Sequence, residues 1–197
     1  MEITWVAYHQ LSSTVAGQLK KVNVVLDIGC GILPQNLVKP SVHICLEPFY
    51  QYIQVLQEKT GNESDRVYVI INATWAEATK IFPARSVDTV FLLDVIEHLD
   101  KEEASCLLKA TETIAREQIV IFTPLGFLPQ RHPDGKDAWG FDGGEWQEHK
   151  SGWQPEDFDD SYQIYASEVV HYVDNVGRAF EKPFGAFYAI KDIKNEN

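Results

Sequence analysis

Cysteine is scarce in this sequence. The 197 residues contain three, Cys30, Cys45 and Cys106, and no two of them have the CxxC spacing of a redox or metal-binding pair. This pattern excludes a disulfide framework. We expect all three to act as small apolar residues in the core of a protein from a reducing compartment.

Long apolar runs and basic clusters are also missing. No segment approaches the roughly 18 apolar residues of a membrane-spanning helix. The first residues lack a basic segment followed by an apolar one, so we expect no signal peptide and a cytoplasmic location. Lys and Arg number 17 against 29 Asp and Glu, a net charge of −12, without any basic run. Such a charge repels phosphate backbones and argues against a nucleic-acid partner.

What the sequence does contain is an alternation of strand and helix patterns. Hydrophobic residues make up 45% of the chain, enough for a sizeable core, and we predict a single domain over residues 1–197. Apolar runs predict strands, and amphipathic segments predict helices between them. The predicted strands are 22–28, 42–46, 67–71, 87–93 and 118–122. The predicted helices are one through Tyr52 and Leu56 that breaks at Gly61, one near 75–81 and one at 101–116. This order is typical of an α/β doubly wound, Rossmann-like sheet, mostly parallel, with helices on both faces.

Several segments depart from this alternation. Residues 1–21 carry apolar side chains at helical spacing, which predicts an N-terminal helix on the domain edge. After the turn that ends at Gly31, about ten residues remain for the crossover to the second strand, close to the lower limit for a parallel connection, so we expect one or two helical turns between Pro34 and Pro40. Residues 125–160 lack periodicity but are rich in aromatic side chains, which predicts an ordered functional loop. Residues 163–175 and 183–190 read as two closing strands.

Polar residues follow the carboxyl ends of the predicted strands. They are Asp27, Glu47, Asn72 and Asp94. Because parallel strands end at one edge of the sheet, these side chains should meet at one rim, where open α/β sheets bind ligands. Gly29 and Gly31 follow the first strand and allow a sharp turn and the close approach of a ligand.

The spacing around this turn indicates which ligand. An acid about twenty residues after a glycine turn, here Glu47, can accept both hydroxyls of a ribose. That feature fits a dinucleotide or S-adenosylmethionine. However, Pro34 stands where a phosphate-binding turn would be followed by another glycine, and Asp27 would repel an anion. A ligand with an ammonium and a sulfonium would not be repelled, so we favour S-adenosylmethionine over NAD.

Taken together, Asp27-Ile-Gly-Cys-Gly31, Glu47, Asn72-Ala73 and Asp94-Val-Ile-Glu-His98 resemble the motif series of class I S-adenosylmethionine-dependent methyltransferases. The resemblance covers residues 22–125. It implies a seven-stranded sheet with an antiparallel closing strand. It also implies that Gly29 and Gly31 face the methionine part of the cofactor, with Asp27 in the same motif. By the same resemblance Glu47 binds the ribose, Asn72 and Ala73 the adenine edge, and Asp94 the methionine end. The usual third glycine is Leu33 here, and Asn72 replaces an acid.

A second group of chemistry-bearing residues follows the fourth strand. Asp94, Glu97 and His98 are spaced to share one face of a turn, and carboxylates with imidazole suit a divalent cation or acid–base work. The pattern resembles a carboxylate-x-x-Glu-His motif that holds Mg²⁺ in small-RNA 3′-terminal 2′-O-methyltransferases and in ubiquinone-pathway O-methyltransferases. In the former a later histidine, here His149, completes the site. The alternative is that Glu97 and His98 cap a helix without metal.

The expected function is therefore methyl transfer. We expect O- or N-methylation of a small molecule or glycan, with His149 as the first candidate base and His98 as the second. We expect His43 and His171 to be core or surface residues. Two alternatives stay open, a metal-assisted ribose 2′-O-methyltransferase acting on RNA and a non-catalytic module that uses this fold to bind a partner protein. The acceptor and the oligomeric state do not follow from the sequence.

Overall fold

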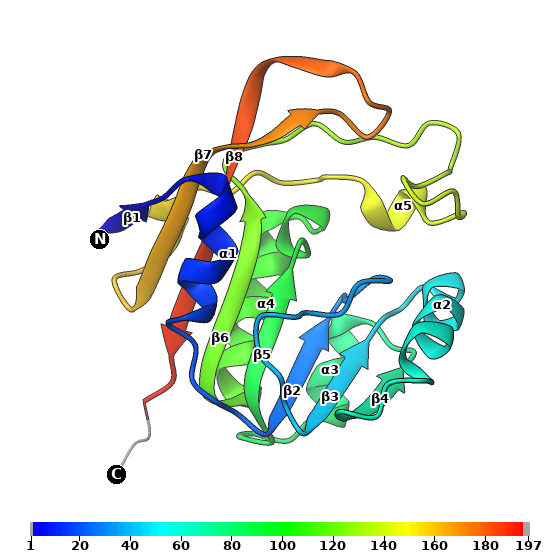
Figure 1. Ribbon diagram of the computed structural model, residues 1–197, viewed down its shortest axis with the longest axis vertical. Coiled ribbons are helices and arrows are strands. Elements are labelled where there is room, and N and C mark those ends of the chain that lie inside the picture. The colour runs from blue at the N-terminus through cyan, green and yellow to red at the C-terminus, as the bar shows by residue number, and fades with distance from the viewer. Residues whose placement is uncertain (1, 195–197) are drawn as a thin grey trace.

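The protein is built on one eight-stranded sheet. The computed structural model describes residues 2–194, and the strand order is β1-β7-β8-β6-β5-β2-β3-β4 (Figure 1). The strands are β1 Ile3–Trp5, β2 Val24–Ile28, β3 Val42–Leu46, β4 Val67–Ile71, β5 Val87–Leu93, β6 Ala115–Pro124, β7 Tyr162–Val173 and β8 Ala179–Asp192. β8 is antiparallel to β6 and to β7, and the other neighbouring strands are parallel. The predicted doubly wound sheet is confirmed, with eight strands in place of seven.

Helices cover both faces of this sheet. They are α1 Tyr8–Ala16, α2 Tyr50–Thr60, α3 Trp75–Ile81, α4 Lys101–Ile114 and the short α5 Gly144–Gln147, with single 3₁₀ turns η1 Ile96–His98 and η2 Pro155–Asp157. The helices predicted at 75–81 and 101–116, and the one through Tyr52 and Leu56, are all present. Among residues 2–194, no helix combines the length and apolarity that a membrane crossing requires.

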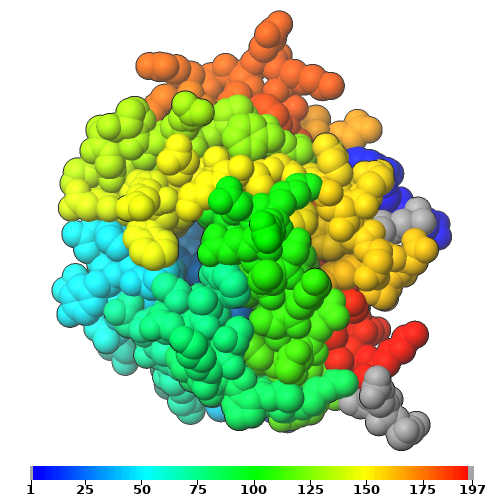
Figure 2. Space-filling view, turned by 180° about the vertical axis from the view of Figure 1, so that it is seen from behind, coloured from blue at the N-terminus to red at the C-terminus, as the bar shows by residue number. Residues whose placement is uncertain are grey.

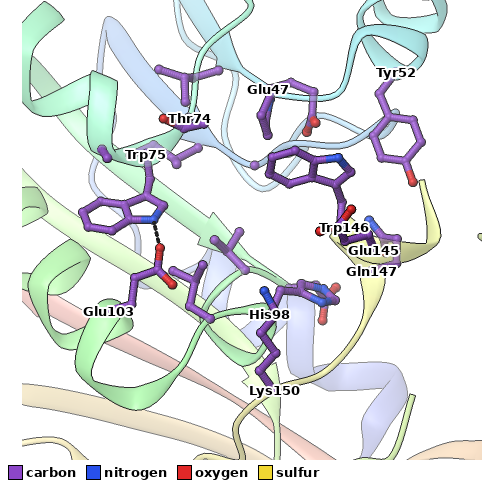
Figure 3. A pocket seen from close by; sticks show the side chains of 18 residues that line it. Glu47, Tyr52, Thr74, Trp75, His98, Glu103, Glu145, Trp146, Gln147 and Lys150 are labelled. Atoms are coloured by element: carbon purple, nitrogen blue, oxygen red, sulfur yellow. Dashed lines mark hydrogen bonds between the residues drawn. The ribbon is translucent and has the colours of Figure 1, made fainter. Parts of the chain in front are cut away.

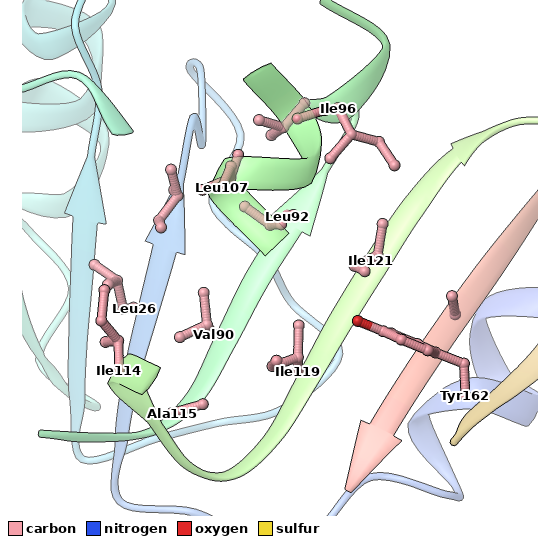
Figure 4. Close-up of a cluster of buried hydrophobic side chains, with 14 of the residues drawn as sticks. Leu26, Val90, Leu92, Ile96, Leu107, Ile114, Ala115, Ile119, Ile121 and Tyr162 are labelled. Carbon is pink, nitrogen blue, oxygen red and sulfur yellow. The ribbon is translucent and has the colours of Figure 1, made fainter. Parts of the chain in front are cut away.

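The core has one layer on each face of the sheet. Side chains of successive strand residues alternate between faces. Val25, Phe91 and Val120 therefore pack against Leu11 and Val15 of α1. Their chain neighbours form the opposite layer with α4, which includes Leu26, Val90, Leu92, Ile119, Ile121, Leu107 and Ile114 (Figure 4). Burial on both faces explains the unbroken apolar runs of these strands.

The N-terminal segment differs from the prediction of one helix over 1–21. Only Tyr8–Ala16 is helical, while Ile3–Trp5 pairs in parallel with β7, Ile3 opposite Ile164 and Trp5 opposite Ala166. The β-branched and aromatic residues Ile3, Thr4 and Trp5 favour a strand, and the free edge of β7 supplies the hydrogen-bonding partners.

The connection between β2 and β3 contains no helix, so the expected turn or two after Pro34 is wrong. The backbone amide of Gln35 instead donates to the carboxylate of Asp27 (2.7 Å). The side chain of Gln35 bonds both backbone groups of Val38, the Val38 amide and the Val38 carbonyl, at 3.1 Å each. Side chains thus replace the backbone bonds that a helix would have provided, in a segment too short to nucleate one.

The cysteines and the long loop complete the comparison with the sequence. Cys30 and Cys45 are buried as expected, but Cys106 is exposed on α4, so its assignment to the core is wrong. The loop 125–160 carries α5 and η2. Trp153 and Phe158 are buried against the sheet, whereas Trp139 and Trp146 remain 40% and 44% exposed.

Candidate functional site

A cavity of about 450 Å³ opens at the carboxyl ends of β2, β3 and β5. Gly29, Glu47, Asp94 and His98 line it, together with side chains of α5 (Figure 3). Figure 2 shows its mouth as a hollow between the segment around residue 146, helices α2 and α3, and the start of α4. The rim predicted from the strand ends therefore encloses a pocket large enough for a small ligand.

The glycine turn has the backbone conformation that only glycine adopts readily. Gly29 has φ of +66° and Gly31 of +56°. Other residues pay about 1–2 kcal/mol for this conformation. A Cβ on Gly29 would lie 3.0 Å from the Val95 side chain, and one on Gly31 would lie 3.4 Å from the ring of Trp139. Gly29 therefore borders the cavity, while Gly31 lies under Trp139.

Glu47 joins this turn to the end of β3. Its carboxylate accepts hydrogen bonds from the amides of Gly31 (2.9 Å) and Phe49 (2.8 Å). Only 3% of the residue is exposed. Burial raises the pKa of Glu47 to about 7, although the two amide donors oppose the shift. A carboxyl group whose pKa lies near neutral pH thus borders the part of the cavity where the sequence predicts the ribose.

Asp27 is buried beneath the turn and does not line the cavity. Besides the Gln35 amide, its carboxylate bonds Nε2 of His43 at 3.2 Å. His43 is fully buried in β3, as expected for a core residue. In this structure Asp27 anchors the β2–β3 connection, and its contact with a cofactor stays a prediction.

Asn72 and Ala73 also lie outside the cavity wall. The side-chain amide of Asn72 donates to the carbonyls of Glu47 (2.9 Å) and Pro48 (2.8 Å), which ties the end of β4 to the end of β3. Thr74 and Trp75, which follow them, line the cavity instead. Nε1 of Trp75 donates to Glu103 at 3.0 Å. The adenine contacts assigned to Asn72 and Ala73 stay predictions.

Asp94 has an unusual backbone. Its φ is +53°, the left-handed region that non-glycine residues rarely adopt. Such conformations concentrate at functional sites, where the surrounding structure maintains them. Asp94 is exposed to the open cavity. The surrounding protein nevertheless desolvates its carboxyl group and raises its pKa to about 6, with a hydrogen bond from Glu97 acting in the opposite direction.

Three of the four predicted metal ligands come together behind Asp94. Ligand atoms of Glu97, His98 and His149 lie within 4.8 Å of one another, and Asp94 is not part of the group. Glu97 is 2% exposed. One of its oxygens accepts the Thr123 hydroxyl at 3.0 Å, and the other, Oε1, is buried without a partner. Burial and then the charge of Asp94 raise the pKa of Glu97 well above its usual range.

The two histidines are oriented alike. Nδ1 of His98 bonds the carbonyl of Glu148 (3.1 Å), and Nδ1 of His149 bonds the carbonyl of Leu128 (2.7 Å). A carbonyl only accepts, so each Nδ1 carries the hydrogen and each Nε2 keeps a free lone pair. Burial lowers the pKa of both rings to about 4. Two imidazole lone pairs beside an unpartnered carboxylate oxygen form a donor set that suits a divalent cation.

Several cavity residues were not anticipated from the sequence. Tyr52 comes from α2, Trp75 from α3 and Trp146 from α5, and Lys150 follows α5. The tryptophans belong to segments where aromatic side chains predict packing as readily as ligand contact, and no spacing rule distinguishes the two. His171 is half-buried in β7, as a strand histidine was expected to be.

Comparisons with known proteins rest on structure alone, because neither a family model nor a curated protein matches the sequence. A methyltransferase of Methanosarcina mazei described as S-adenosylmethionine-dependent aligns with a TM-score of 0.62 and 14% identity, over 93% of this chain and 98% of its own. The methyltransferase domain of a bacterial Hen1 protein, CtHen1, gives 0.58 and 16%, over 93% and 97%. Magnesium protoporphyrin IX methyltransferase from Synechocystis PCC 6803, solved with bound S-adenosylmethionine, gives 0.52 and 14%, over 91% and 77%. The chain therefore has the class I S-adenosylmethionine-dependent methyltransferase fold.

Proposed function

We propose that the protein is an S-adenosylmethionine-dependent methyltransferase that methylates an oxygen, or a nitrogen, of a small molecule or glycan. The observation that carries this proposal is one continuous cavity bordered by Gly29, Glu47 and Asp94 that reaches His98. The residues fit the cofactor. Glu47 offers a carboxylate to ribose hydroxyls, Gly29 leaves room for a backbone contact, and Asp94 offers a carboxylate to an ammonium group.

S-adenosylmethionine supplies an activated methyl group, so the chain has to position the acceptor, exclude water and remove a proton. His98 lines the cavity, and with a pKa of about 4 it is neutral at pH 7 with a free Nε2 lone pair. It is therefore the better placed base. His149 does not line the cavity and lies behind His98, their ring centroids 4.8 Å apart. This order reverses the one expected from the sequence.

The charge around the cavity favours a neutral or cationic acceptor. Glu47, Asp94, Glu103 and Glu145 line it, against one lysine, Lys150. Because the whole chain carries a net charge of −12, an anionic acceptor would be repelled at every stage of its approach. A small uncharged hydroxyl compound or a glycan meets no such barrier.

The experiment that tests this proposal is calorimetric titration with S-adenosylmethionine and S-adenosylhomocysteine. We expect saturable binding that Glu47→Gln weakens by about tenfold or more, because a charge-assisted hydrogen bond is worth about 1.5–3 kcal/mol. Glu58→Gln, an exposed change on the same helix as Tyr52, is the control. Absence of binding at millimolar ligand would overturn the proposal and would favour the non-catalytic module.

A second candidate is metal-assisted methylation of a ribose 2′-hydroxyl on RNA, and the cluster of Glu97, His98 and His149 favours it. These residues would hold the cation, which supplies Lewis-acid activation of a hydroxyl. Titration with Co²⁺, followed by its visible absorption, tests the site without any activity assay. We expect His149→Ala to abolish the bands and the exposed His9→Ala to leave them unchanged. Absent bands with the wild-type protein, or methyl transfer unaffected by EDTA, would remove this candidate.

A further inference from the structure

One part of the long loop covers the glycine turn. We call residues 137–147 the roof segment, and it is held by the carboxylate of Asp137, which is 7% exposed. Oδ2 of Asp137 accepts the hydroxyl of Tyr52 at 2.6 Å. Its Oδ1 accepts the amides of Trp139 (2.8 Å) and Phe141 (3.0 Å). One buried side chain therefore fixes the fold of the roof segment and joins it to α2.

Further contacts hold the roof segment against the same helix. The Tyr52 ring lies edge-on to Trp139, with centroids 5.2 Å apart, and to Phe141, with centroids 6.0 Å apart. The amide of Asp142 donates to the Gln51 side chain at 3.1 Å. A Cβ on Gly143 would overlap the Tyr52 hydroxyl and the Asp137 carboxylate, so this position has no room for a side chain.

The end of the roof segment places an indole in the cavity. Trp146 of α5 lines the cavity, and 44% of it is exposed. Figure 3 shows its ring on the same side of the cavity as Glu47, with Trp75 on another wall. An indole exposed in a concave site gains burial when a flat ligand covers it, and stacking of a base on an aromatic ring is worth about 1–3 kcal/mol.

We propose that Trp146 packs on the nucleoside part of the cofactor, and that Asp137 is the positioning residue that presents it. This inference rests on the proposed function, since it assumes that the nucleoside occupies the cavity beside Glu47. The roof segment then contributes to holding the methyl donor, and Tyr52 of α2 connects that segment to the cofactor-binding half of the sheet.

The test uses two ligands. S-adenosylhomocysteine contains the nucleoside and the amino acid, whereas 5′-methylthioadenosine lacks the amino acid. We expect Trp146→Ala to weaken both ligands by the same factor, about tenfold or more, and Trp146→Phe to retain most of the affinity. Trp5→Ala, an exposed tryptophan outside the cavity, is the matched control. Circular dichroism and thermal unfolding verify that each variant folds.

A double-mutant cycle tests Asp137. Asp137→Asn should weaken the binding of S-adenosylhomocysteine. Combining it with Trp146→Ala should cause no further loss of affinity, because both changes remove the same contact between the indole and the nucleoside. Asp134→Asn, an exposed change just before the roof segment, should have no effect. Unchanged affinity of Trp146→Ala, or loss for S-adenosylhomocysteine alone, overturns this inference and leaves the proposed function intact. A wild-type protein that binds neither ligand overturns both.

Discussion

At the scale of single residues, burial shifts the pKa values of four site groups in the direction that favours their uncharged forms. His98 and His149 have pKa values lowered to about 4 by burial, while burial raises the pKa of Glu47 to about 7 and of Asp94 to about 6. The histidines and the carboxyls therefore affect stability in opposite directions as pH changes. Because the folded state favours the neutral form of each group, the stability that the histidines contribute falls at low pH. The stability that the carboxyl groups contribute falls at high pH.

The histidine effect leads to a prediction for His149→Asn. The unfolded chain binds a proton at His149 below its ordinary pKa of 6.5, and the folded chain does so only below about 4. Stability from this residue is therefore complete above pH 6.5 and lost as pH falls toward 4. Between pH 7 and pH 5, in EDTA, the wild type should lose about 1–2 kcal/mol relative to the variant. Urea unfolding at the two pH values measures this, and parallel losses would contradict it.

Residue types at strand ends were readable from the sequence, but the directions of their side chains were not. Glu47 and Asp94 line the cavity, whereas Asp27 and Asn72 bond the backbone beside it. The period of two that orients side chains along a strand does not extend past its end, where Asn72 lies, and Asp27, still inside β2, is covered by the β2–β3 connection. The position of Trp146 in the cavity could not be predicted for another reason. Its loop has no hydrophobic periodicity from which the direction of a side chain could be inferred.

At the scale of elements, the β7–β8 hairpin shows a close approach of two backbones. The register shifts between Ser167 and His171, opposite Gly185. A Cβ on Gly185 would overlap the carbonyl oxygen of Ser167 and lie 3.0 Å from that of Glu168. Backbone atoms in a paired strand have little freedom to move, so glycine at this bulge is a packing requirement.

We therefore expect Gly185→Ala to lower the free energy of unfolding by about 1–3 kcal/mol, the range for overpacked interiors. Gly17→Ala is the control, since φ there is −69° and the nearest atom to its Cβ would be 3.4 Å away. That change should stay within about 0.5 kcal/mol. Denaturant unfolding of the two variants compares them, and equal stability would show that the hairpin rearranges.

Elements with strong periodicity were predicted well. Strands 42–46, 67–71 and 87–93 and the helix 75–81 agree with β3, β4, β5 and α3 in their residues. The two failures, β1 and the missing β2–β3 helix, have different causes. Ile3–Trp5 is a strand because the free edge of β7, distant in the sequence, supplies its partner. Residues 29–41 are irregular because Asp27 and Gln35 satisfy the backbone through side-chain bonds that helical periodicity does not predict.

At the scale of the whole molecule, charge separates the two candidate functions. A net charge of −12 repels RNA, so affinity for it would have to come from the Glu97–His98–His149 cluster and a bound cation. We expect no saturable binding of a short RNA with a 3′-terminal ribose at physiological salt, with or without Mn²⁺. Fluorescence anisotropy measures it. Binding that needs Mn²⁺ and disappears in His149→Ala would favour the RNA candidate.

The position of β8 has a consequence for how the chain is made. Among the strands of residues 2–194, β8 is the last in sequence, but it lies inside the sheet, between β6 and β7 (Figure 1). During synthesis, the unit from β2 to β6 can collapse first, leaving the edge of β6 unpaired until Ala179–Asp192 emerge. A nascent chain therefore carries an open strand edge along β6 from the time that β6 is made until β8 follows it, and during that interval the edge can pair with another chain.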